Sequence, residues 1–150
     1  IEKDGKIVPK IKISNNTIKI TNPGFKKVYR AYDNKTGYAI ADIIELNPKL
    51  LNQKELLIID PSNPNNKRVI NDFTLVPLQK TIFKNGNLVY EENNLDIDDV
   101  AKYCHDQMET LYEEVKRTLM PHKYQVATTE EYLEYKDDVI EKERVKIKKI

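Results

Sequence analysis

The spacing of hydrophobic residues changes once along the chain, near residue 94, and this change most strongly limits the fold. Before residue 94 apolar and polar residues alternate, as in half-buried β-strands; after it, apolar residues recur every three or four positions, as on one face of an α-helix. The 150 residues amount to one domain that is long enough to bury a core. We therefore expect an α+β fold, with mostly antiparallel strands in residues 7–91 followed by two helices at about 96–119 and 129–143.

Within this scheme the chain divides into a strand-rich part, residues 1–91, and a helical part, residues 92–150. Alternation predicts strands at 8–14, 17–21, 27–33, 38–46 and 73–83. Pro77 cannot donate a ladder hydrogen bond, so it limits its strand to an edge, a bulge or two separate pieces. Asn85 and Gly86 predict a tight hairpin turn. The polar residues 61–66 predict a surface loop.

The first helix is predicted from one continuous apolar stripe. Its members are Ile97, Val100, Ala101, Cys104, Met108, Leu111, Tyr112, Val115 and Leu119. Pro121 is expected to end this helix, because proline disfavours helical geometry in the residue before it. Thr128 and Glu131 have the spacing of a capping box and predict the start of the second helix.

Charge is unevenly distributed, although the formal net charge is only +1. Residues 1–30 contain eight basic and two acidic side chains, so the remainder of the chain is acidic on balance. This basic segment is compatible with an anionic ligand, or with a strand whose solvent face carries lysine. The small net charge gives no general attraction to nucleic acid, and no apolar run reaches the length of a membrane span.

The residues contain no complete catalytic or metal-binding motif. Cys104 and His105 are adjacent, and adjacent helical residues point about 100° apart, so they cannot form a nucleophile–base pair. Cys104 lies on the apolar stripe and is expected to be a buried packing residue, while His122 is expected in a loop. A single cysteine excludes an internal disulfide, and four scattered glycines form no phosphate-binding loop. We therefore assign no catalytic residue and no metal ligand.

Six stretches together carry a family resemblance, in colinear order over nearly the whole chain. They are residues 9–14, 19–30, 36–42, 81–91, 111–117 and 121–126. The second contains Lys19-Ile20-Thr21-Asn22-Pro23-Gly24-Phe25-Lys26, which is similar to a Lys-x-Thr-x-Pro-Gly-x-Lys pattern. The chain resembles the C-terminal region of nicotinate phosphoribosyltransferase.

This resemblance implies part of a type II phosphoribosyltransferase fold, with an α/β sandwich and a barrel-like catalytic domain. It implies a cytoplasmic parent enzyme of NAD salvage that makes nicotinate mononucleotide from nicotinate and phosphoribosyl pyrophosphate with ATP hydrolysis and Mg²⁺. It also implies that the partner of this chain is the remainder of that enzyme, which can form a homodimer. The family's phosphate-binding glycines and catalytic histidine lie upstream of the matched region, so we expect this chain alone to bind no cofactor and to be structural and inactive.

The family pattern and the basic segment together place Lys12, Ser14, Lys19 and Lys26 closest to the catalytic barrel. The chain starts at Ile1 without an initiator methionine, as expected for a piece of a longer polypeptide. The alternative is a free-standing module that binds an anion or another protein through its basic face.

Overall fold

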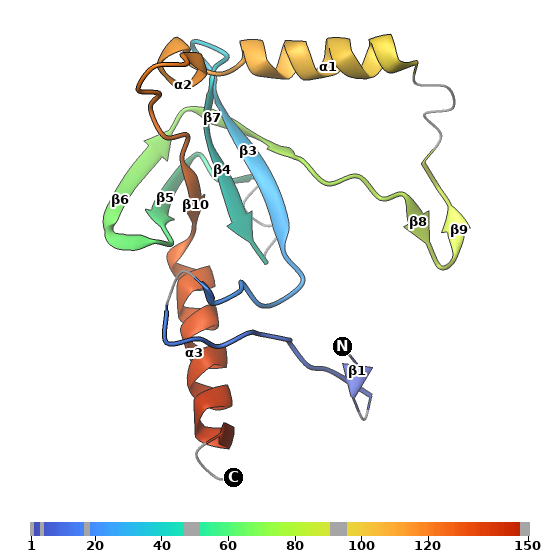
Figure 1. Cartoon of the computed structure of the whole chain (residues 1–150), viewed down its shortest axis with the longest axis vertical. Helices are drawn as coiled ribbons and strands as arrows, with labels where there is room; N and C mark the ends of the chain where they lie inside the picture. Colours follow the sequence, from blue (N-terminus) through green and yellow to red (C-terminus); the bar gives the residue numbers. More distant parts are fainter. Residues whose placement is uncertain (1, 4, 17–18, 47–51, 91–95, 148–150) are drawn as a thin grey trace.

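The computed structural model describes residues 2–3, 5–16, 19–46, 52–90 and 96–147 (Figure 1). Its centre is a six-stranded sheet with the strand order β6-β5-β10-β4-β3-β7. The strands of this sheet are β3 (Lys27–Asp33), β4 (Ala39–Glu45), β5 (Glu55–Asp60), β6 (Asn63–Asn71), β7 (Phe73–Pro77) and β10 (Val126–Thr128). The other elements are β1 (Glu2–Lys3), β2 (Lys6–Ile7), β8 (Phe83–Lys84), β9 (Asn87–Leu88), α1 (Ile97–Glu109), α2 (Glu113–Lys116) and α3 (Glu130–Ile147).

All neighbours in the central sheet are antiparallel except β10 and β4, which are parallel. The α+β class with a mostly antiparallel sheet is therefore confirmed. The strand β10 was not anticipated, because three residues are too few to show alternation. It lies between β5 and β4 and joins the two halves of the sheet.

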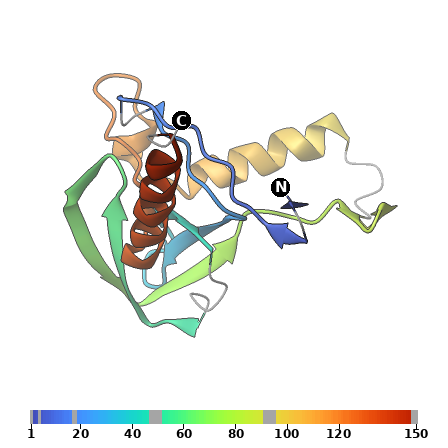
Figure 2. The same ribbon diagram turned by 90° about the horizontal axis from the view of Figure 1, so that it is seen from below.

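The core is formed by one face of this sheet. Its buried side chains come from all six strands and are Tyr29, Ala31, Ala41, Ile43, Leu56, Ile58, Ile70, Phe73, Leu75 and Ala127. Only Asp72 separates the two edge strands β6 and β7 along the chain, so the sheet curves to bring its edges together, as Figure 2 shows. Positions 31, 41 and 127 of the central strands are alanines, and all three are fully buried in this core.

Several strand predictions are confirmed. β3 and β4 pair as the expected hairpin, and Pro77 lies in β7, an edge strand. The tight turn between β8 and β9 has positive φ at Asn85 and Gly86, as a type I′ turn requires. The predicted loop at 61–66 is shorter than expected, because β6 already begins at Asn63; its proline, Pro64, is tolerated because β6 is the other edge strand.

The N-terminal alternation at 8–14 does not form a ladder strand. This segment is extended and meets the second alternating stretch through the Thr21 amide, which donates to the Lys12 carbonyl at 3.3 Å. Alternation predicts an extended backbone, but a strand also needs a partner in register. The strand predicted at 17–21 falls partly on residues 17–18, which lie outside the described residues.

The expected helix over 96–119 is divided in two. α1 ends at Glu109, and the carbonyl of Thr110 accepts a hydrogen bond from the Ala39 amide of β4 at 2.8 Å. This bond turns the chain toward the sheet, and α2 then covers only Glu113–Lys116, so the helix ends well before Pro121. No residue of α1 is buried, so the expectation that Cys104 packs in the core is wrong: its thiol is exposed.

The second expected helix is α3, which extends to Ile147. Its cap differs from the prediction by one residue, because the Thr129 hydroxyl accepts a hydrogen bond from the Tyr132 amide at 3.2 Å. Thr128 instead donates its hydroxyl to the Ile44 carbonyl at 2.9 Å and so belongs to the sheet. Among the described helices, none has the length and apolar character needed to cross a membrane.

Candidate functional site

The four predicted site residues lie on the segment that leads into β3. Lys26 is the most constrained of them, because its ammonium group donates to the carbonyls of Asn22 at 2.7 Å and Gly24 at 3.1 Å. Lys12 and Lys19 have exposed side chains, and the Ser14 hydroxyl accepts a hydrogen bond from the Asn16 amide at 3.2 Å. Local hydrogen bonds thus help to order the described parts of this segment.

A groove of about 600 Å³ lies beside the turn at Gly24. Of the four predicted residues, Lys26 lines this groove, whereas Lys12, Ser14 and Lys19 are not among the lining residues. The lining side chains are Val8, Pro9, Lys10, Phe25, Lys26, Leu46 and Tyr135, together with Gly24. Two ammonium groups at one groove, with an exposed Phe25 ring, can attract an anion that has a planar or apolar part.

Gly24 fixes the shape of this groove. Its φ is +87°, which favours glycine, and a Cβ atom there would lie 2.7 Å from Leu46 Cδ2 and 3.2 Å from the Tyr135 ring. The turn can therefore approach β4 and α3 only because residue 24 has no side chain. Sequence reasoning identified the Pro-Gly turn but missed Tyr135, which is far away in the sequence.

A buried polar cluster lies beneath the turn. The Tyr132 hydroxyl donates to the Pro23 carbonyl at 2.8 Å, and both residues are fully buried. The carboxylate of Glu45 is 1% exposed and accepts hydrogen bonds from the Thr129 hydroxyl and, at 2.6 Å, from the Leu46 amide. Burial raises the pKa of Tyr132 well above its ordinary range. These contacts join the turn, the end of β4 and the start of α3 into one unit.

Lys136 adds a further link between α3 and the turn. Its ammonium group donates to the side-chain oxygen of Asn22 at 2.8 Å. Burial lowers the pKa of Lys136, because desolvation disfavours the charged form. The position of the turn is therefore set by α3 on one side and by Lys26 on the other.

A second polar cluster lies on the opposite face of the sheet. The guanidinium of Arg30 on β3 binds both carboxylate oxygens of Asp42 on β4, and the Tyr124 hydroxyl donates to Asp42 at 3.1 Å. The hydrogen bond with Asp42 raises the pKa of Arg30, and burial raises that of Tyr124 above the ordinary range. Arg30 therefore stays a cation and Tyr124 a neutral donor, so this cluster fixes structure without exchanging protons near neutral pH.

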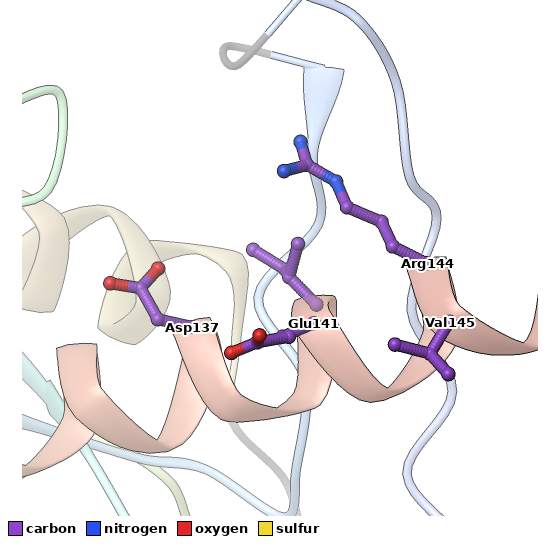
Figure 3. Close-up of a pocket in the computed structure, with 5 residues that line it drawn as sticks. Asp137, Glu141, Arg144 and Val145 are labelled. Carbon is purple, nitrogen blue, oxygen red and sulfur yellow. The ribbon is translucent and has the colours of Figure 1, made fainter.

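Other recesses lie away from the turn. One, of about 420 Å³, is lined by Tyr124 and by His122, whose amide donates to the Glu114 carbonyl at 2.7 Å; His122 lies in a loop, as predicted. Another, of about 410 Å³, runs along α3 (Figure 3). There the guanidinium of Arg144 points away from the helix, apart from the carboxylates of Asp137 and Glu141. This recess is a surface feature of one helix.

The described side chains can attract an anion at the groove and hold the Pro23–Gly24 turn in place. Within the described part of the chain, no three His, Cys, Asp or Glu side chains gather closely enough to hold a metal ion. Cys104 and His105 lie on an exposed helix, and the structure brings no base to the thiol among the described hydrogen bonds. We therefore assign no metal site within the described residues and derive no chemical step through a metal ion.

Comparison with known proteins gives consistent matches. The family described as "Nicotinate phosphoribosyltransferase C-terminal domain" matches residues 25–136. The chain is 37% identical over 132 residues to nicotinate phosphoribosyltransferase of Bacillus subtilis, covering 87% of this chain and 26% of the relative. It is 28% identical over 130 residues to the Caenorhabditis elegans nicotinate phosphoribosyltransferase, covering 85% of this chain and 23% of that relative.

A solved structure shows the same fold. The crystal structure of human nicotinic acid phosphoribosyltransferase superimposes with a TM-score of 0.68 at 20% identity, over 79% of this chain and 23% of that chain. The expectation that the chain is part of a type II phosphoribosyltransferase fold is confirmed. The chain spans about a quarter of the length of the relatives that it matches.

Proposed function

The chain belongs to the nicotinate phosphoribosyltransferase C-terminal domain family, and from this premise we propose that it is the supporting C-terminal portion of an enzyme that makes nicotinate mononucleotide. The observation that carries this proposal is the family match over residues 25–136, which includes the central sheet, α1, α2 and the start of α3. The chain itself is inactive, because its polar clusters are tied up in structural hydrogen bonds. The reaction belongs to the remainder of the enzyme.

In this proposal the parent enzyme joins nicotinate to phosphoribosyl pyrophosphate and hydrolyses ATP in NAD salvage. Nicotinate, phosphoribosyl pyrophosphate, ATP and Mg²⁺ bind in the remainder of the enzyme in this proposal. The working form is a cytoplasmic enzyme, and a homodimer is compatible with it. A reducing compartment suits the exposed free thiol of Cys104.

The basic segment is proposed to face the catalytic barrel. Lys12, Ser14, Lys19 and Lys26 lie in the part of the chain with the greatest excess of positive charge, and Lys26 lines a groove with a second lysine. Positive charge near the site raises the local concentration of an anionic substrate such as phosphoribosyl pyrophosphate. Lys12→Ala and Lys19→Ala in the intact polypeptide should raise KM for this substrate and leave kcat nearly unchanged.

Lys35→Ala is the matched control, because Lys35 is an exposed lysine in the β3–β4 turn. It removes the same charge at another place and should leave KM unchanged. Unaltered KM and kcat in the lysine variants of the basic segment would reject the proposed position of that segment.

A second candidate is a free-standing module that binds an anion at the groove beside Gly24. The observation in its favour is the pair of lysines, Lys10 and Lys26, on one groove of about 600 Å³. Calorimetry of the 150-residue chain with inorganic pyrophosphate distinguishes the two. Saturable pyrophosphate binding that is lost in the Lys10→Ala variant would favour the module. No pyrophosphate binding would favour the supporting role.

The main proposal is tested by deleting residues 1–150 of this chain from the intact polypeptide that carries it. The truncated polypeptide should lose nicotinate mononucleotide formation and unfold at a lower temperature, because the supporting portion is gone. An intact source polypeptide with the 17.6 kDa mass of this chain alone would contradict the proposal.

A further inference from the structure

α1 presents an apolar surface that the described residues of its own chain leave open. All thirteen residues of α1 are described, and none is buried. Four side chains form a line along it, namely Ile97, Ala101, Cys104 and Met108; we call this line the outer seam. All four are exposed, with Ile97 at 79% and Met108 at 46%.

The outer seam has the spacing of a helix–helix contact. Its members are separated by four, three and four residues, which places them within an arc of about 60° on a helix of 3.6 residues per turn. This is the a/d spacing of a coiled-coil seam, in which apolar side chains insert between those of a facing helix or groove. Single exposed apolar residues are common on any protein surface, but these four share one side of one helix.

The contacts of α1 with its own chain use a different side of the helix. The Tyr32 hydroxyl donates to the Gln107 side chain at 3.3 Å, and Gln107 is the one half-buried residue of α1. Val100 and Tyr103 line a groove of about 510 Å³ shared with Leu78 and Ile82. Tyr103 points about 100° away from Cys104, and Val100 lies between the groove and the outer seam, about 40° from Cys104, so most of the seam lies outside this groove. Figure 1 shows α1 extending sideways beyond the sheet.

The charges of α1 indicate what can cover the outer seam. The helix carries four acidic residues, Asp98, Asp99, Asp106 and Glu109, and a single basic one, Lys102. At about 100° per residue, Asp98 and Glu109 lie on one margin of the outer seam, whereas Asp99 and Asp106 lie on the far side of the helix. A partner with an apolar centre and a basic group beside Asp98 and Glu109 is complementary.

The length of the relatives indicates where such a partner comes from. The chain spans 26% of the Bacillus subtilis relative and 23% of the Caenorhabditis elegans relative, so about three quarters of each lies outside it. We propose that the outer seam docks into an apolar groove formed by the remainder of the same polypeptide. This inference rests on the proposed function and adds the surface through which the supporting portion is held.

Cys104 lies in the middle of the outer seam and is the only cysteine of the chain, so it serves as the probe. The experiment measures the rate of maleimide labelling at Cys104, by peptide mass spectrometry, in the 150-residue chain and in the intact polypeptide. Coverage of the seam should slow labelling at least about tenfold in the intact polypeptide, because thiol reactivity depends on access. Equal rates in the two samples would overturn the inference.

The matched control is Asp106→Cys, on the opposite side of the same helix from the outer seam. A thiol at this position should be labelled at similar rates in both samples. Equal slowing at positions 104 and 106 would overturn the inference, because it would mean burial of the whole helix. Slowing at Cys104 that disappears when a dimer is diluted to monomer would assign the seam to a second copy, which also overturns it.

Nicotinate mononucleotide formation by the same intact sample separates this inference from the proposed function. Product formation together with a freely labelled Cys104 rejects the docking surface alone. Protection of Cys104 in a polypeptide that makes no product supports the docking surface and rejects the proposed function.

Discussion

Arg30 and Asp42 face each other across β3 and β4, and the guanidinium binds both carboxylate oxygens, at 2.8 and 3.0 Å. Their side chains are only 19% and 16% exposed, and the Tyr124 hydroxyl completes the set of donors to Asp42. A partly buried bidentate pair resists solvent screening and holds two strands in register. This pair connects the hairpin to the segment that precedes β10.

Asp42→Asn tests the strength of this pair. Asparagine keeps the shape and an acceptor for Tyr124 but removes the charge opposite Arg30, so the free energy of unfolding should fall by about 2–3 kcal/mol. Urea unfolding measures the change. Asp106→Asn is the control, because its pair with Lys102 is exposed and should be worth at most about 0.5 kcal/mol. Equal losses in the two variants would mean that burial does not strengthen the Arg30 pair.

Tyr132→Phe tests the link between α3 and the turn. It removes the hydroxyl that donates to the Pro23 carbonyl and leaves a buried acceptor without its partner, so stability should fall by about 1–2 kcal/mol. Thermal unfolding followed by circular dichroism measures the loss. Tyr103→Phe is the control, since Tyr103 is 61% exposed and should change stability little. No difference between the two variants would show that the buried hydrogen bond does not contribute.

Gly24→Ala tests the close approach at the groove. The added Cβ must either move Leu46 and Tyr135 or shift the turn, so we expect a loss of about 2–4 kcal/mol from backbone strain and steric overlap together. Gly86→Ala is the control, because Gly86 also has positive φ but nothing lies within 4 Å of its Cβ position. Chemical denaturation measures the loss of unfolding free energy in each variant. The difference between the two losses is the cost of the steric overlap at position 24. Equal losses would show that the turn can relax away from Leu46.

Asp33 gives the fold a dependence on acid pH. Its carboxylate accepts hydrogen bonds from the amides of Thr36 and Lys35, both at 2.8 Å, and these bonds lower the pKa of Asp33. The unfolded chain therefore takes up the proton first. The stabilisation is complete above the unfolded pKa of about 3.9 and is lost as pH falls toward the folded value.

Asp33→Asn keeps an acceptor in the turn but cannot titrate. The wild-type chain should exceed this variant in urea midpoint at about pH 6, and the difference should shrink as pH falls below about 4. A difference that stays constant across this range would contradict the lowered pKa of Asp33.

Most of the sheet was predictable because alternation and turn residues are local signals. The β3–β4 hairpin, the edge position of Pro77 and the Asn85-Gly86 turn all follow from neighbouring residues. The strand β10 and the break after α1 depend on pairing with β4, a distant part of the chain, and no local pattern encodes such pairing. Helical periodicity gave the apolar stripe of α1 correctly, but periodicity cannot say whether a stripe meets its own core or another partner.

The candidate site was predictable only in part for the same reason. The basic segment and the Pro-Gly turn are visible in the sequence, and Lys26, which follows this turn, lines the groove in the structure. Tyr135, Glu45 and Thr129 come from other elements and reach the turn only through tertiary packing. The opposite charges of Arg30 and Asp42 offered a signal, but their pairing needs the hairpin register, which includes a shift between Ala31 and Tyr32.

The most direct test of the account is to measure nicotinate mononucleotide formation, from nicotinate, phosphoribosyl pyrophosphate and ATP, by the purified 150-residue chain and by the intact polypeptide that carries it. The account predicts product from the intact polypeptide and none from the 150-residue chain. Product from the 150-residue chain alone, or none from the intact polypeptide, would contradict it.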